Sequence, residues 1–401
     1  MSNLKLNKVA APTAPAAGKV SFYSDTNDLG RAKMIDDNSV VHSLSPSGTR
    51  DNNVVLNGDF GIYQRGTHVA TLQSNRVYFA DRWGISIQVS SCTFSQIDTS
   101  GSPETNYAPQ YYGKFVQTTA IGKFLVSQVI SHANMAHLRG RTVRCQFKAR
   151  QSAGTNAVLR MGLMQLTAAG TVDTVTNASF LATFPTGTGT DPTFPANHTL
   201  ISPTLVEASS TIVNSAITTP SLTSSWTRYS ATFTIPSNAK NLVLLIWTNA
   251  QIQVNDAICI GEVGLYDGME IRDWMVRPET LDLLQCQRYY CKTFALATTP
   301  AFQILFGSLK WNVGVAGAVS GVWGIWKFPV RMRIAPPTIA FYSPVTAASA
   351  QAYQFSATAG VCTATSATSV SDEGLQITTT PAATAVIGSV VGVQITADAE
   401  L

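Results

Sequence analysis

NVVLNGDFGIYQRGTHVATLQSNRVYFADRWG, residues 53–84, is the stretch that decides the fold. It opens with the apolar run Val54-Val55-Leu56, and β-branched residues suit a pleated strand that is covered by other parts of the chain. Asn57-Gly58 follows and predicts a turn. After the turn, large apolar residues alternate with Asp, Arg and Gln without a helical period. The stretch therefore predicts short strands that pack on one another.

The composition narrows the class of protein. The chain has 401 residues, which predicts two or three domains. Charged residues make up only 12% and hydrophobic residues 45%, whereas charged residues usually reach about 25% of a globular domain. This balance favours a β-rich extracellular or virion scaffold over a cytosolic α/β enzyme. The net charge of +4 is small and no basic block occurs, so we expect no nucleic-acid partner.

The chain shows no sequence signal for export, membrane insertion or metal binding. Residues 1–20 lack the apolar core of a signal peptide, and no apolar run approaches the ~18 residues of a membrane-spanning helix. We therefore expect a soluble protein that is made in the cytoplasm. Its six cysteines are then expected to be free and buried, and without a CxxC pair they predict no zinc site.

The order of the segments predicts a mainly β chain with four parts. Residues 1–52 read as an extended N-terminal arm, rich in Pro and Ala at first, which is too thin to form a core alone. Residues 53–277 carry about eight strand-like runs separated by turns, as in a β-sandwich of the jelly-roll type. Within them, residues 170–221 form a long Thr/Pro/Gly-rich insertion, which predicts a functional loop or a partner contact.

The two remaining parts are a helix and a second β unit. Residues 278–291 predict a connecting helix, since Pro278 and Glu279 favour a helix start and Leu281, Leu284 and Cys291 follow at helical spacing. We expect this helix to pack against both neighbours. Residues 292–401 read as a C-terminal β domain whose thin strands need neighbouring chains, so it is expected to trimerise or to form a tip.

Catalytic motifs are missing from the sequence. There is no GxSxG, and the histidines stand in no nucleophile or metal context. The carboxylates worth testing for glycan cleavage are Asp59, Asp81, Glu104, Asp256 and Glu262. Among these, we expect Asp59 to cap the turn at Asn57-Gly58 and Asp81 to pair with Arg82 or Arg65. We therefore predict no catalytic residue, no cofactor and no metal.

A sugar-binding surface is better supported by the residue types. Aromatic rings stack on sugar rings, and neighbouring polar groups hydrogen-bond the hydroxyls. The candidates are three tyrosines near one predicted loop, Tyr107, Tyr111 and Tyr112, together with Trp226 and Arg228 on a later strand. The alternative for each aromatic residue is packing in the core.

Several motifs in this order resemble a known family. They are LNGDF, YQRGT and ADRWG within residues 56–84, WTRYSATF at 226–233, QCQRYY at 285–290 and ADAEL at 397–401. As a set covering residues 53–401, they resemble bacteriophage virion fibre proteins, and the opening is similar to many carbohydrate-binding jelly rolls.

This resemblance implies a location, partners and a role. The chain would be a homotrimer in the virion, joined to other tail or capsid proteins through residues 1–52. As a non-enzymatic tail fibre it would adhere to host-surface glycan. The alternatives are a head fibre or capsid decoration protein that stabilises the shell, and a glycan depolymerase. The sequence by itself implies only that copies associate.

Overall fold

The expectation of a mainly β chain is confirmed. The computed structural model describes residues 8–9, 13, 15–17, 19–25, 32–36, 41–43, 53–65, 68–101, 108–154, 156–167, 173, 181–184, 187–296, 298, 307–314, 316–317, 321–355, 360–382 and 385–400. These residues form three β-sheets, two short α-helices and one 3-10 helix. No helix among them is long and apolar enough to cross a membrane. All six cysteines are free and buried.

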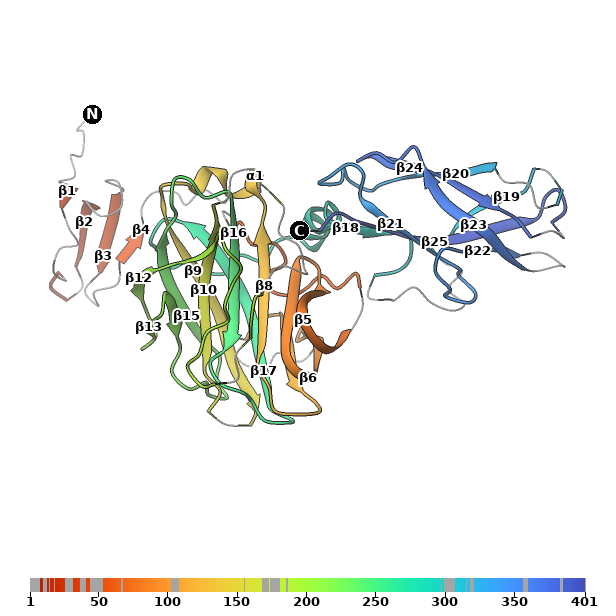
Figure 1. Cartoon of the computed structure of the whole chain (residues 1–401). Helices are drawn as coiled ribbons and strands as arrows, with labels where there is room; N and C mark the ends of the chain where they lie inside the picture. The colour runs from red at the N-terminus through yellow and green to blue at the C-terminus, as the bar shows by residue number, and fades with distance from the viewer. Residues whose placement is uncertain are drawn as a thin grey trace, which may run out of the picture.

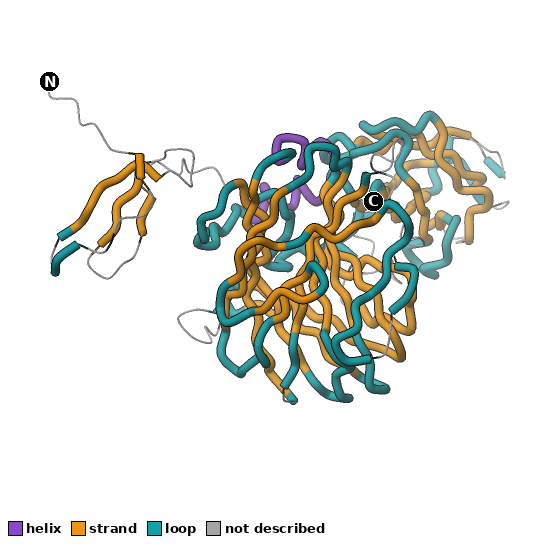
Figure 2. The backbone as a smooth tube through the Cα atoms, turned by 60° about the vertical axis from the view of Figure 1, so that its left-hand side comes forward, coloured by secondary structure: helices purple, strands orange, loops and turns teal. Residues whose placement is uncertain are grey.

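The N-terminal sheet stands apart from the rest of the chain in both views (Figures 1 and 2). Its four strands pair in sequence order, and their bounds are β1 Lys8–Val9, β2 Val20–Asp25, β3 Ala32–Asp36 and β4 Val41–Ser43. Tyr23 and Ile35 are buried, whereas Val20 and Phe22 on the opposite side of β2 are exposed. The arm is therefore folded into a small sheet that leaves one apolar face open.

The central unit is a β-sandwich built from one continuous sheet that folds over. Its strands are β5 His68–Ala80, β6 Trp83–Asp98, β7 Tyr111–Gln117, β8 Phe124–Ile130, β9 Thr142–Ala153, β10 Leu159–Leu166, β11 His198–Ile201, β12 Pro203–Val206, β13 Thr211–Val213, β14 Ala216–Thr218, β15 Thr227–Thr234, β16 Asn241–Thr248 and β17 Ala257–Asp267. The first half of β6 pairs with β8 and the second half with β7. Strand β6 thus joins two layers, which we name the β9 layer (β12-β15-β9-β17-β7) and the β16 layer (β8-β16-β10-β14-β13).

The main core lies between these layers. Alternate residues of β9, such as Cys145 and Phe147, point into it, while Arg144, Gln146, Lys148 and Arg150 occupy the outward positions. A group of phenylalanine rings fills the end near β6, with centroids 4.8–6.2 Å apart, namely Phe60, Phe79, Phe94, Phe115 and Phe124. The aromatic residues of the opening stretch are therefore core residues.

The outer face of the β16 layer is also buried. Every residue of β8 and β16 is buried, because a second apolar cluster, which includes Trp247, lies on the outer side of these strands. The insertion supplies its lid, which we name the cover (residues 181–184 and 187–201), with Leu181, Phe184, Phe194 and Leu200 packed on the cluster. This part of the insertion is thus a packing element, and the predicted role of residues 170–221 as a functional loop or a partner contact stays a prediction.

The connecting helix is shorter than the predicted helix over residues 278–291. Helix α2 covers Glu279–Gln287, and strand β18, Tyr290–Lys292, begins soon afterwards because it pairs with a later strand. The prediction that Cys291 shares a helical face with Leu281 and Leu284 is therefore wrong. The other helical pieces are α1, His132–Met135, and the 3-10 helix η1, Ala136–Leu138, both beside the sandwich.

The C-terminal β unit is organised around its last strand. Its strands are β19 Leu309–Asn312, β20 Gly321–Lys327, β21 Thr338–Tyr342, β22 Ala352–Phe355, β23 Gly360–Thr368, β24 Gly374–Thr380 and β25 Val390–Asp398. Strand β25 pairs with β18, β21, β19 and β22. It runs back toward the sandwich, so the C-terminus lies between the two units (Figure 1).

Four of the motifs that suggested a family, YQRGT, ADRWG, QCQRYY and ADAEL, meet at this junction. Gln64 donates to the carbonyl of Tyr290 (2.7 Å), and Ala399 N donates to the carbonyl of Tyr289 (2.7 Å). Arg82 pairs with Glu400 in a buried ion pair. Side chains from residues 57–83 thus hold the chain end against the sandwich, which gives these motifs a structural role.

Two sequence expectations for carboxylates can be compared with this junction. A carboxylate oxygen of Asp81 lies 3.7 Å from a guanidinium nitrogen of Arg65, whereas Arg82 pairs with Glu400 and not with Asp81. Asp59 accepts the amide of Gly61 (3.0 Å), directly after the turn that Phe60 N closes on the Asn57 carbonyl (3.1 Å). Burial raises the pKa of Asp59 to about 6 and that of Asp81 to about 6.

Candidate functional site

The outer face of the β9 layer carries the strongest candidate site. Part of this face is crossed by the strap, which we define as residues 268–277. Arg144 donates to the carbonyl of Met269 (2.5 Å), and Gln146 donates to the carbonyl of Arg272 (2.6 Å). These bonds fix the strap over one end of β9 and leave the other end, at Lys148 and Arg150, partly exposed.

An aromatic cluster with a guanidinium lies at the exposed end. The rings of Tyr112 and Trp226 meet edge to face, with centroids 5.0 Å apart and an interplanar angle of 70°. The guanidinium carbon of Arg150 lies 5.7 Å from the Tyr112 centroid and 5.2 Å from the Trp226 centroid. Arg150 also donates to the Tyr112 hydroxyl (3.2 Å). Cation–π attraction and this bond hold the three side chains together.

The tryptophan of this cluster is only half-buried. Its indole nitrogen is enclosed and finds no hydrogen-bond acceptor among the residues that the structure describes. An indole N–H is a donor only. Trp226 therefore presents part of its aromatic ring at the surface, while its indole N–H stays enclosed.

A charged pair sits next to the cluster. Lys148 Nζ lies 2.9 Å from the carboxylate of Glu262. Glu262 has φ of +50°, at an irregularity of β17 where the register with β9 shifts between Gly261 and Gly264. Burial raises the pKa of Glu262, and the hydrogen bond from Lys148 opposes that rise. The β-bulge thus aims one carboxylate at the outer face.

The structure brings only part of the predicted sugar-binding set together. Tyr112 and Trp226 are in contact, and Arg228 lies two residues beyond Trp226, where it donates to the carbonyl of Arg272 (3.2 Å). Tyr111 lies elsewhere, beside Gly61, because successive side chains of a strand point to opposite faces. Tyr107 falls outside the described residues.

Sequence reasoning missed Lys148 and Arg150, and it named Glu262 only as a carboxylate worth testing for glycan cleavage. The alternation of apolar and charged residues over 142–150 was a usable signal for the two basic residues, since it places them on one outer face. Nothing in the sequence pointed to Glu262 as a member of this face, because its direction depends on the irregularity in β17.

The cleavage candidates have structural partners where the structure describes them. Asp81 accepts the Gln64 amide (2.6 Å), and Asp256 accepts the amide of Gln253 (2.8 Å). Glu104 lies outside the described residues. No group of three or more His, Cys, Asp or Glu within the described ranges could hold a metal ion.

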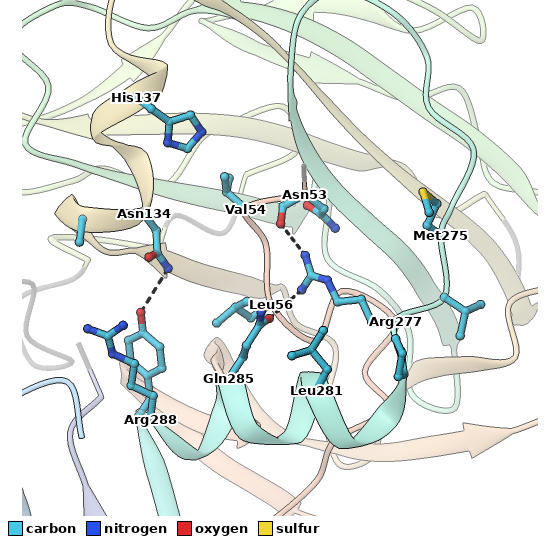
Figure 3. Close-up of a pocket in the computed structure, with 14 residues that line it drawn as sticks. Asn53, Val54, Leu56, Asn134, His137, Met275, Arg277, Leu281, Gln285 and Arg288 are labelled. Carbon is cyan, nitrogen blue, oxygen red and sulfur yellow. Dashed lines mark hydrogen bonds between the residues drawn. The ribbon is translucent and has the colours of Figure 1, made fainter. Parts of the chain in front are cut away.

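A separate groove opens between the sandwich and α2, with a volume of about 730 Å³. Its walls are α1 and η1, residues 53–56, the end of the strap and α2 (Figure 3). Arg277 crosses the floor, donating to the carbonyls of Asn53 and Val55 and to Gln285. Asn134 donates to the Tyr289 hydroxyl (3.4 Å). Much of the polar lining is therefore occupied by contacts within the chain.

No family model matches the chain, and no curated protein matches it. One similar solved structure is the enzymatically active domain of bacteriophage CBA120 tailspike protein 4, at 12% identity and a TM-score of 0.30, which covers 54% of this chain and 22% of that one. Another is the CBM22-1-GH10 part of Clostridium thermocellum xylanase 10B with xylohexaose, at 12% and 0.29, covering 55% and 29%. A third is TmCBM61 with β-1,4-galactotriose, at 10% and 0.28, covering 54% and 99%. The chain thus spans less than a third of the first two, and at such TM-scores we take no functional conclusion from these likenesses.

Proposed function

We propose that the chain is a non-enzymatic phage fibre protein that adheres to host-surface glycan through the outer face of the β9 layer. The observation that carries this proposal is the cluster of Tyr112, Trp226 and Arg150 at the exposed end of that face. Tyr112 is buried beneath the half-buried ring of Trp226. An accessible aromatic ring beside charged donors suits sugars, which need stacking on their C–H faces and hydrogen bonds to their hydroxyls.

Each residue of the face would have a distinct task. Trp226 would stack its accessible ring on a sugar ring. Arg150 and Lys148 would donate to hydroxyls or to an acidic substituent, and Glu262 would accept from a hydroxyl. Such a shallow site is expected to bind weakly. Several copies acting together would supply strength without new contacts.

The assembly forms part of the proposal. We infer a homotrimer in the virion, with residues 1–52 docking to other tail or capsid proteins. The exposed Val20 and Phe22 of the N-terminal sheet support a docking role for the arm, since apolar side chains on an open sheet face gain from being covered.

Retention of the purified full chain on immobilised host-surface polysaccharide tests the adhesion. We expect the wild type to be retained, and W226A and R150A to bind about tenfold or more weakly, since each loses one stacking or charged contact. The matched control is R331A, which removes an exposed arginine of the C-terminal unit and should leave retention unchanged.

Two results would overturn the proposal. The first is a wild-type chain that does not bind polysaccharide or cells from any host that the phage infects. The second is shortening of the polysaccharide during the same incubation, which would make the protein a depolymerase. A copy number in the virion close to that of the capsid protein would favour a decoration protein instead.

A further inference from the structure

We propose that the surface formed by the end of the strap and α2 is where this chain contacts a second copy of itself. The inference rests on the proposed assembly and assigns its interface. The surface, which we name the ridge, consists of Met275, Val276, Leu281 and Leu284.

The ridge is unusually apolar for an open surface. Of nineteen large apolar side chains that are exposed among the described residues, six fall between residues 269 and 284, and four of those form the ridge. Their exposed fractions run from 39% for Leu284 to 62% for Val276. Large apolar side chains that cluster in this way mark an interaction site more often than single exposed ones do.

The local structure explains why these residues face outward. The inner side of α2 carries Asp282 and Cys286, which are buried. The Asp282 carboxylate accepts the amide of Asn57 (3.4 Å) and pairs with Arg277 (3.3 Å). A polar anchor thus fixes the helix with its leucines on the opposite side. In a helix that packed only within its own chain, burying Leu281 and Leu284 and exposing Asp282 would be more stable.

The groove gives the ridge a receiving surface. Leu281 and Gln285 rise from α2 into it, and Met275 stands on the opposite rim (Figure 3). Its volume of about 730 Å³ leaves room for several side chains of a neighbouring chain. Met275, Val276 and Leu281 of the ridge themselves line the groove, so a second copy that inserts side chains there would cover them.

The charges around the ridge favour a second copy as the occupant. Asp273 and Glu279 are exposed beside the start of α2, where Asp273 also pairs with Arg228 (3.4 Å), while Arg288 is exposed just after its end. One surface therefore carries carboxylates at one end and a guanidinium at the other. The acidic end of one copy can pair with the basic end of the next, which sets register and suppresses wrong partners.

The test measures the mass of the full chain by sedimentation velocity across a range of concentrations. We expect the wild type to associate and V276D/L281D to weaken association about tenfold or more, because two charges would be buried in the contact. The control I325D/I387D changes two side chains of the C-terminal unit that are at least as exposed, at 66% and 71%, and should associate normally. All four positions are exposed, so the unfolding midpoints should stay close to the wild type.

A charge exchange tests the self-complementary arrangement. R288E should weaken association, and R288E/E279R should restore it. If V276D/L281D keeps the wild-type mass, the ridge is not the interface, although the assembly would stand. If the wild type remains a monomer at every concentration, both the assembly and its interface are wrong.

Discussion

The outer face of the β16 layer is sealed by its own chain, whereas the outer face of the β9 layer keeps charged and aromatic side chains at the surface. On the sealed face, the cover buries Trp247 and its apolar neighbours. On the open face, Trp226 stands half-exposed beside Arg150. The two tryptophans have similar cation–π neighbours, since Arg160 lies 5.6 Å from the Trp247 centroid. The two clusters contain similar residue types. They differ because the chain covers the Trp247 cluster and leaves the Trp226 cluster at the surface.

Basic residues show the same contrast. Lys123 on the sealed face is buried and donates to the carbonyls of Gly187 (2.6 Å) and Thr190 (3.1 Å), so its charge pins the cover. Arg160 pairs there with Asp191. On the open face, Lys148 pairs with Glu262 of a neighbouring strand. The insertion therefore closes one face, and ligands of the sandwich are expected on the other.

Truncating the two tryptophans should separate the faces most clearly. W247A removes a fully buried ring, and we expect it to lower the free energy of unfolding by about 3–5 kcal/mol. W226A removes a half-exposed ring with one edge-to-face contact, and should cost about 1 kcal/mol. Urea unfolding of both variants checks this. Equal losses would mean that the open face is packed as tightly as the sealed one.

Replacing the lysines should give a smaller difference. K123A leaves carbonyls of the cover without their donor, and we expect a loss of about 1–3 kcal/mol together with faster proteolysis within residues 187–191. K148A breaks a surface pair and should cost about 1 kcal/mol or less. The measurement is again urea unfolding, with limited digestion mapped by mass spectrometry. A K123A protein with an unchanged digestion pattern would show that Lys123 does not hold the cover.

The sequence predicted the class of fold, but it did not predict which face of the sandwich is covered by other parts of the chain. The strand-like runs predicted within residues 53–277 include β9 and β15, and both belong to the β9 layer. The unbroken apolar runs of β8 and β16 could not reveal what covers them, since a cover distant in sequence leaves no local pattern. The helix prediction ran past residue 287 because pairing of Tyr290–Lys292 with β25 overrides helical spacing.

The site was predictable only in part for the same reason. Tyr112 and Trp226 were identifiable as aromatic residues near loops, but their contact depends on β7 and β15 lying in one layer. Arg150 belongs to the site because β9 lies in the same layer. Glu262 belongs to it because the irregularity of β17 turns its side chain toward this face. Long-range pairing decides such neighbours, and a single sequence does not record it.

The smallest predicted effect concerns pH on the open face. Burial raises the pKa of Glu262, so the folded chain keeps this proton at pH values where the unfolded chain has released it. Glu262 therefore contributes its full stabilisation at pH values below its ordinary pKa of about 4.3. This contribution is lost as the pH rises through the pKa that Glu262 has in the folded chain. We expect the stability of the wild type to fall relative to that of E262Q as the pH rises above about 4, measured by urea midpoints. Parallel pH profiles of the two proteins would contradict this origin of the shift.

Hydrogen exchange of the full chain with and without purified host polysaccharide tests the central claim most directly. We predict slower exchange at residues 111–117, 142–153 and 226–234, which form the open face, and unchanged exchange at residues 187–201 in the cover. Protection of the cover without protection of the open face would contradict the account.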